Sequence, residues 1–209
     1  MRMMLQIVLL IVSGPLLAFD HSGWNTLLAE HVAPLRGGVA TAVDYAGMRR
    51  DQEQLDAYLE SLSGVSIQGF KDFSRDEKLA FLINAYNAYT IKLILLEDTP
   101  DSIRDIGNFL SGPWDKEFIF LLGKARTLDE LEHEMIRGNP DLLDPRIHFA
   151  VNCASIGCPA LRPEAYTADN LEAQLEDSTR KFLSDKQRNR FNADKNALEV
   201  SKIFDWYEE

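Results

Sequence analysis

The feature that most constrains this 209-residue chain is a long apolar segment behind a helix-capping signal. Ser74 and Glu77 have the spacing of a capping box, in which each side chain bonds the backbone amide of the other residue. From Leu79 to Leu96 apolar residues recur at helical spacing and also fill the other faces of the helix. Such a helix must be covered on all sides, so the pattern predicts a central, buried helix.

Shorter elements are predicted around this helix. A second capping box, Thr127 with Glu130, begins one of them, and alternation over 146–151 favours a half-buried strand, with a helical turn as the alternative. The predicted helices cover residues 24–32, 49–62, 127–137 and 168–183, and another begins at 203. The predicted strands cover residues 118–122, 146–151, 190–192 and 197–200. The pattern predicts an α+β fold, a mostly helical single domain with a small sheet.

The N-terminus is typical of a secretory signal peptide. Arg2 precedes an apolar run that Gly14 and Pro15 interrupt, and Ala18 is a small residue suited to cleavage. The run is too short to cross a bilayer, so we expect a periplasmic or secreted protein with no stable membrane span after cleavage. Residues 19–71 would form an N-terminal helical extension to a domain over 72–209. The last helix lacks a cap, so we expect the domain's C-terminal end to be incomplete.

The charge of the chain limits its partners. It has 22 Lys and Arg against 33 Asp and Glu, a formal net charge of −11. Removal of residues 1–18 takes away only Arg2 and deepens the net charge to −12. Nucleic acids and anionic lipids usually require a basic face, so we expect neither as a partner. A small ligand that bears a carboxylate remains compatible with this composition.

The segment from Arg146 to Leu161 concentrates the reactive side chains. A thiol at such a turn can be activated by an imidazole and attack a carbonyl. This interpretation makes Cys153 the nucleophile and His148 the base, with Asn152 and Cys158 contacting the substrate. Three alternatives stay open: a Cys153–Cys158 disulfide in an oxidising compartment, zinc binding with His148 at a spacing that fits no usual zinc motif, and simple burial of two small thiols.

Polar side chains on two predicted helices form a second set of candidates. Asn84 and Asn87 lie one turn apart on the apolar helix, where each unpaired amide would cost about 1–3 kcal/mol. Asn84 would assist catalysis and Asn87 would contact the substrate; the alternative is that both bond a nearby loop backbone. His133 and Arg137 are four residues apart and would bind a substrate carboxylate in a cleft; the alternative is surface ion pairing.

Other motifs are missing from the sequence. It contains no phosphate-binding loop, no Gly-x-Ser-x-Gly, no His-Glu-x-x-His and no Cys-x-x-Cys, so we expect no cofactor and no metal. His21 and His31 have no convergent partners in the sequence, and we expect both at the surface.

Four stretches, in order, resemble the DUF547 domain family: residues 81–90, 127–137, 146–159 and 200–207. The similarity covers about residue 72 to the C-terminus. The resemblance implies a compact α+β domain of exported bacterial proteins, a papain-like arrangement and an association with small thiol peptides such as glutathione. It also implies that the matching positions line the family's site; these are Asn84, Asn87, His133, Arg137, His148, Cys153 and Cys158.

These observations lead to three functional hypotheses. The first is an exported thiol-dependent hydrolase or acyl transferase that acts on a small peptide-like substrate. The second is a non-catalytic binding module for a small thiol peptide or for a protein partner. The third is a structural domain in which the motif residues serve only as core and caps.

Overall fold

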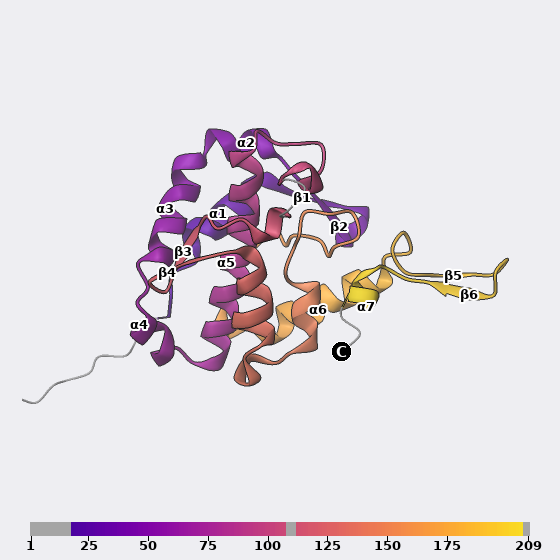
Figure 1. Cartoon of the computed structure of the whole chain (residues 1–209). Coiled ribbons are helices and arrows are strands. Elements are labelled where there is room, and N and C mark those ends of the chain that lie inside the picture. Colours follow the sequence, from indigo (N-terminus) through magenta and orange to yellow (C-terminus); the bar gives the residue numbers. More distant parts are fainter. Residues whose placement is uncertain (1–17, 108–111, 207–209) are drawn as a thin grey trace, which may run out of the picture.

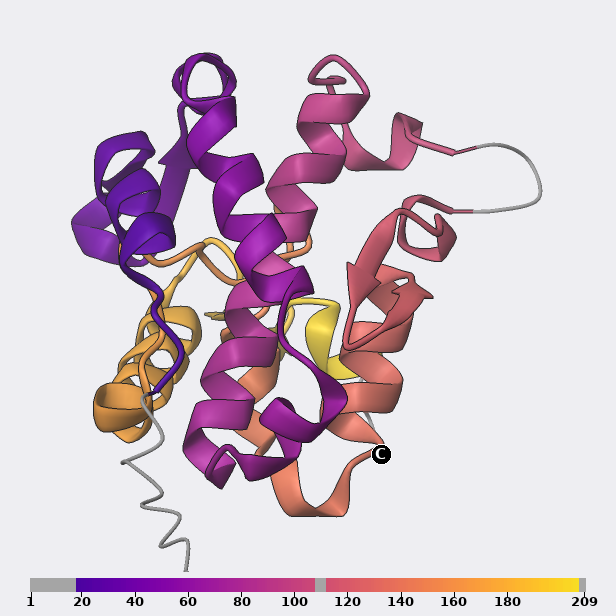
Figure 2. The ribbon, with the colours of Figure 1, turned by 90° about the vertical axis from the view of Figure 1, so that its left-hand side faces the viewer.

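The computed structural model describes residues 18–107 and 112–206, and the predicted signal peptide falls almost entirely outside this range. Helix α5 (Arg75–Leu96) runs through the middle of the molecule, with α3 (Gln52–Ser63) on one side and α6 (Leu171–Ser184) on the other in Figure 1. Figure 2 shows α6, in orange, below the indigo N-terminal segments. The predicted capping box is confirmed: Ser74 N donates to Glu77 Oε2 at 2.7 Å, and Glu77 N donates to Ser74 Oγ at 3.3 Å. The prediction of a central, buried helix is therefore correct.

Helix α5 is long and apolar enough to cross a membrane, the one such helix among the described residues. In the fold, 89% of its most apolar window is buried. Its apolarity is thus explained by the protein core that surrounds it.

The N-terminal part packs on one side of α5. It consists of α1 (Ser22–His31), β1 (Val32–Leu35), β2 (Ala40–Val43), α2 (Tyr45–Arg50), α3 (Gln52–Ser63) and α4 (Ile67–Asp72). Trp24 and Leu55 are fully buried in the same core as α5. The hairpin β1–β2 was not predicted, because Pro34 and the Gly37-Gly38 turn interrupt its apolar pattern. The helix predicted over 49–62 is divided at Asp51 into α2 and α3.

The C-terminal part covers the other side of α5. It consists of β3 (Ile119–Leu121), β4 (Lys124–Arg126), the π-helix η4 (Glu130–Arg137), the 3-10 helices η6 (Pro145–Phe149) and η7 (Ala168–Asn170), α6 (Leu171–Ser184), β5 (Arg190–Asn192), β6 (Ala197–Glu199) and α7 (Ile203–Trp206). The described strands form three separate antiparallel pairs, which together with the helices confirm a mostly helical α+β domain.

The strand predicted over 146–151 is wrong. Residues Pro145–Phe149 form a 3-10 helix instead. Asp144 Oδ1 accepts a hydrogen bond from Arg146 N at 3.0 Å and so caps this helix, and Pro145 occupies its first position, where no amide is needed. Apolar residues do alternate in this segment, but the cap from Asp144 favours helical backbone angles over an extended strand.

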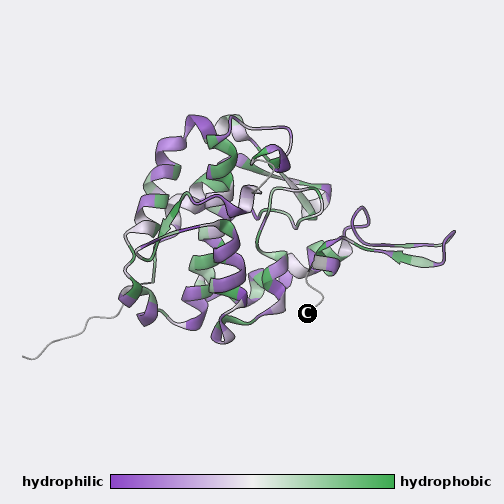
Figure 3. Cartoon of the chain, viewed as in Figure 1, coloured by the Kyte–Doolittle hydropathy of each residue, from purple (hydrophilic) through white to green (hydrophobic). Residues whose placement is uncertain are grey.

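The two short strands predicted over 190–192 and 197–200 are present as β5 and β6, and they pair as a hairpin that projects from the body of the molecule (Figure 1). Phe191 pairs with Leu198 across the strands, and they are 60% and 74% exposed. The hydrophobic colour on this hairpin in Figure 3 reflects such residues, whereas most apolar side chains of the helices face the core.

His21 and His31 were predicted at the surface, and both predictions are wrong. His21 is 8% exposed, with Nδ1 2.8 Å from the Tyr58 hydroxyl. The His31 side chain is 9% exposed, with Nε2 2.7 Å from Asp51 Oδ2. Their partners lie on α3 and at its start, so helix packing supplied contacts that sequence spacing could not show.

Burial of His21 predicts acid sensitivity. Burial lowers the pKa of His21 to about 4, although Asp20 opposes the shift. Below about pH 6.5 His21 is protonated in the unfolded chain but stays neutral in the folded chain. The folded state therefore loses stability as the pH falls from 6.5 to 4. We expect His21 to account for up to about 3 kcal/mol of this loss.

The measurement is urea unfolding at pH 7, 5.5 and 4.5 for the wild type and His21→Phe. The variant should lose less stability between pH 7 and 4.5 than the wild type does. Equal losses in the two proteins would contradict a buried, neutral His21.

Candidate functional site

Two asparagines on α5 hold two distant chain segments. Asn84 Nδ2 donates to Tyr166 O at 2.7 Å, and Tyr166 N donates back to Asn84 Oδ1 at 3.0 Å. Asn87 Nδ2 donates to Ala150 O at 3.0 Å, and Asn152 N donates to Asn87 Oδ1 at 2.8 Å. Both asparagines are almost completely buried. Each amide therefore fixes a loop backbone by two hydrogen bonds.

These contacts correct three predicted roles. The carbonyl and amino groups of Asn84 and Asn87 bond protein backbone, which is a positioning role in place of the predicted catalytic and substrate-binding roles. Asn152 behaves in the same way, because its Nδ2 donates to Pro159 O at 2.6 Å and its Oδ1 accepts from Ala154 N at 2.9 Å. The open alternative, that the helix amides bond a nearby loop, is the correct one, and all three residues position the chain.

The two cysteines form a disulfide, with their Cα atoms 6.1 Å apart. Cys158 is 3% exposed and Cys153 is half-buried. A sulfur in a disulfide is not a thiolate, so in this state Cys153 is not the predicted nucleophile and Cys158 is not a substrate contact. Of the alternatives left open for this pair, the disulfide is the one that the structure contains.

The π-helix η4 brings His133 and Arg137 together. Arg137 Nη1 lies 2.5 Å from His133 Nδ1, and His133 Nε2 lies 3.5 Å from Asp129 Oδ1. A guanidinium only donates, so Nδ1 must accept, which puts the imidazole proton on Nε2. π-Helical turns are rare and often occur at functional sites.

His148 approaches this pair from the 3-10 helix η6. Burial first, and then the charge of Arg137 and the nearby His133, lower the pKa of His148 to about 4. The side chain is therefore neutral at pH 7 and acts as a hydrogen-bonding group. His133, Arg137 and His148, selected on chemical grounds from two parts of the sequence, do meet in space.

These three side chains line a cavity of about 660 Å³ between η4 and η6. Asp144 also lines the cavity, but its carboxylate accepts hydrogen bonds from Arg146 Nε at 2.9 Å and from Nη2 at 2.7 Å. Burial alone would raise the pKa of Asp144, and the bonds from Arg146 outweigh burial and lower it. Arg146 also binds Glu172, at 2.6 and 2.8 Å, so its guanidinium holds η6 against α6.

His133 also lines a second cavity, of about 450 Å³. Its lining includes Cys153 of the disulfide together with Tyr86 of α5 and the partly buried Trp114. The other lining residues are Arg104, Asp115, Asp129, Glu132 and Ser155. His133 is thus the side chain shared by both cavities.

Comparison with known proteins identifies the family of this chain. The family model described as a protein of unknown function, DUF547, matches residues 70–183, more than half of the chain. The chain belongs to the DUF547 family. No curated protein and no solved structure was found to match it, so a papain-like arrangement stays a prediction. The matched residues of this DUF547 chain include α5, the helices η4 and η6, and the disulfide. The hairpin β5–β6 lies outside the match.

Sequence reasoning missed several residues of the second cavity. Tyr86 stands between the two asparagines, and its apolar neighbours made it look like core. Glu132 is only 5% exposed, although acidic side chains are mostly found at the surface. Arg104 and Trp114 come from a loop-rich stretch with no periodicity to place them.

The asparagine contacts generate a stability prediction. Asn84→Ala and Asn87→Ala each remove two hydrogen bonds and leave buried backbone groups unpaired, which should cost about 2–4 kcal/mol. Thr90→Ala is a matched control on the same helix, because the Thr90 hydroxyl bonds only Tyr86 O of its own helix. Urea unfolding should show a much larger loss for either asparagine variant than for the control. Equal losses would contradict the positioning role.

Proposed function

We propose that this DUF547 domain binds a small, peptide-like ligand through its carboxylate in the cavity between η4 and η6. The observation that carries the proposal is the meeting of His133, Arg137 and His148 around one cavity in a chain of net charge −11. The volume, about 660 Å³, lies within the range of about 300–1,000 Å³ usual for small-ligand sites.

Arg137 supplies the charge for such a ligand. A guanidinium has five N–H donors in a planar fork, which suits a carboxylate held by two parallel hydrogen bonds. Its bond to His133 Nδ1 fixes one edge of the fork, and the neutral His148 adds a hydrogen-bonding group without adding repulsion. The single guanidinium charge of Arg137, with the neutral His148 in the same cavity, fits a monoanionic group better than a phosphate or a polyanion.

We also propose that the protein is exported and works in the periplasm or outside the cell. The support is the N-terminal sequence together with the Cys153–Cys158 disulfide, a bond that persists mainly in oxidising compartments. The acidic composition supports small ligands, and not nucleic acids, as partners.

Removal of the guanidinium tests the proposal. The probe is acetyl-alanyl-alanine with a free carboxylate, compared with its C-terminal amide, by NMR titration of the full chain. The free acid should bind more tightly than the amide, and Arg137→Gln should weaken the acid at least about tenfold, the loss of a charge-assisted hydrogen bond.

Arg180→Gln is the control, since Arg180 is an exposed arginine on α6 whose nearest acidic partner is 3.9 Å away. This control should bind the acid as the wild type does. If the acid and the amide bind alike, or if Arg137→Gln changes nothing, the cavity is not a carboxylate site.

A second candidate function, thiol chemistry at Cys153, is favoured by one observation: Cys153 and His133 line the same cavity. Reduction would free the Cys153 thiol for the thiol-dependent hydrolase or acyl transferase predicted from the sequence. Alternatively, a thiol peptide would attack Cys153 Sγ as its thiolate, break the Cys153–Cys158 bond and release the Cys158 sulfur, which takes up a proton. The peptide would then be held as a mixed disulfide.

Alkylation separates this candidate from a purely structural disulfide. Without reductant we expect no iodoacetamide labelling of either cysteine. After mild reduction Cys153 should be labelled at least about tenfold faster than Cys158, because Cys153 is half-buried and lines a cavity whereas Cys158 is buried. Mass spectrometry of tryptic peptides gives both rates, and equal, slow labelling would exclude an activated Cys153.

A further inference from the structure

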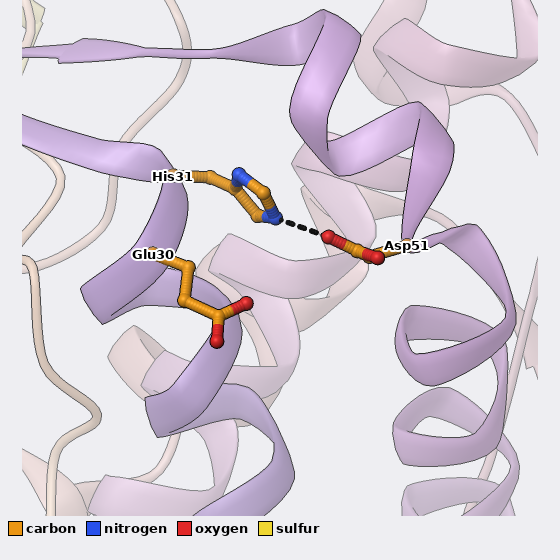
Figure 4. A group of neighbouring side chains, drawn as sticks. All are labelled: Glu30, His31 and Asp51. Atoms are coloured by element: carbon orange, nitrogen blue, oxygen red, sulfur yellow. Dashed lines mark hydrogen bonds and ion pairs between the residues drawn. The ribbon is translucent and has the colours of Figure 1, made fainter.

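We propose that His31, Asp51 and Glu30 form a binding site for one zinc ion at the junction of α1, α2 and α3. One donor atom from each residue lies within 4.8 Å of the other two, and in Figure 4 both carboxylates lie near the Nε2 edge of the His31 ring. The site shares no residue with either cavity described above. It is therefore independent of the proposed ligand-binding function.

Three helices fix the donors. Glu30 and His31 are the last two residues of α1, and Asp51 lies between the end of α2 and the start of α3. Asp51 occupies the N-cap position of α3, yet its side chain makes no capping bond. Its carboxylate turns to His31 instead, with Oδ2 2.7 Å from Nε2.

The charges at this junction favour a cation. The carboxylates of Glu30 and Asp51 lie close together, and no lysine or arginine among the described residues forms an ion pair with either of them. Arg50, which is next to Asp51 in the sequence, forms its ion pair with Asp44 instead, at 3.6 Å. Two neighbouring negative charges repel each other, and a metal ion bound between them would remove that repulsion.

The donor set fits zinc. Zinc takes histidine nitrogen and carboxylate oxygen at about 2.0–2.2 Å, and sites with three protein ligands complete the tetrahedron with water. Donors around such an ion lie about 3.4 Å apart, so Asp51 has to withdraw slightly from His31 and Glu30 has to approach. Glu30 is exposed and can swing in, which also leaves a path for the ion.

The other edge of the His31 ring is fixed by close packing. A Cβ on Gly47 would lie 2.4 Å from His31 Nδ1 and 2.5 Å from Asp44 Oδ2, so only glycine fits at this position of α2. The ring is 9% exposed and has little room to rotate. Nε2 is therefore held toward the two carboxylates before any ion arrives, which lowers the ordering cost of binding.

Calorimetric titration of chelator-treated protein with zinc chloride tests the site. The wild type should bind one zinc per chain, and zinc should raise the melting temperature. His31→Ala should weaken binding at least about 100-fold, the loss of one of three ligands. Magnesium chloride should bind far more weakly, because magnesium disfavours imidazole.

Two further variants keep the test decisive if His31→Ala fails to fold. Glu30→Gln changes an exposed side chain and should bind zinc about tenfold more weakly, whereas Glu53→Gln, an exposed acid on α3 outside the group, should bind it as the wild type does. Absence of stoichiometric binding, equal binding by Glu30→Gln and Glu53→Gln, or loss of binding in His133→Ala would overturn the proposal.

Discussion

The rest of the structure depends on the paired hydrogen bonds between α5 and two loops. Asn84 and Asn87 lie on a helix that is otherwise surrounded by apolar side chains, where an unpaired amide would cost about 1–3 kcal/mol. Their bonds to Tyr166 and to the 150–152 backbone remove that cost and fix where both segments cross the helix. The loop that carries the disulfide begins at the second crossing, so its position follows from Asn87.

The site follows from this arrangement. The 3-10 helix η6 ends just before the Asn87 contact, and it is held at its other side by Arg146 between Asp144 and Glu172. Held at both ends, η6 presents His148 toward Arg137 and His133 of the π-helix. His133 lines both the cavity that contains Arg137 and the cavity that contains Cys153 of the disulfide. A ligand-binding role uses the first cavity as it stands, whereas thiol chemistry in the second requires reduction.

The sequence predicted the elements that have strong local signals. It also selected His133, Arg137 and His148, which line one cavity, but it did not predict the hydrogen-bond partners of the candidate residues. Capping boxes at Ser74 and Thr127 depend on neighbours three residues apart, so they could be read directly, and the structure contains both. The strand over 146–151 failed because alternation is shared by strands and short helical turns, and the Asp144 cap decided between them. The roles of the asparagines and the burial of His21 depend on partners 37 to 82 residues away, which no local pattern specifies.

The central claim is that Arg137 and His148 share one cavity that takes a carboxylate, and the titration of His148 tests it most directly. In the free protein, NMR of the His148 ring should give a pKa near 4, set by burial and then by the charges of Arg137 and His133. Saturation with acetyl-alanyl-alanine places a negative charge beside the ring and should raise this pKa, while Asp144 stays paired with Arg146. A pKa of His148 that is unchanged at saturation, or that lies near 6.5 in the free protein, would contradict the account.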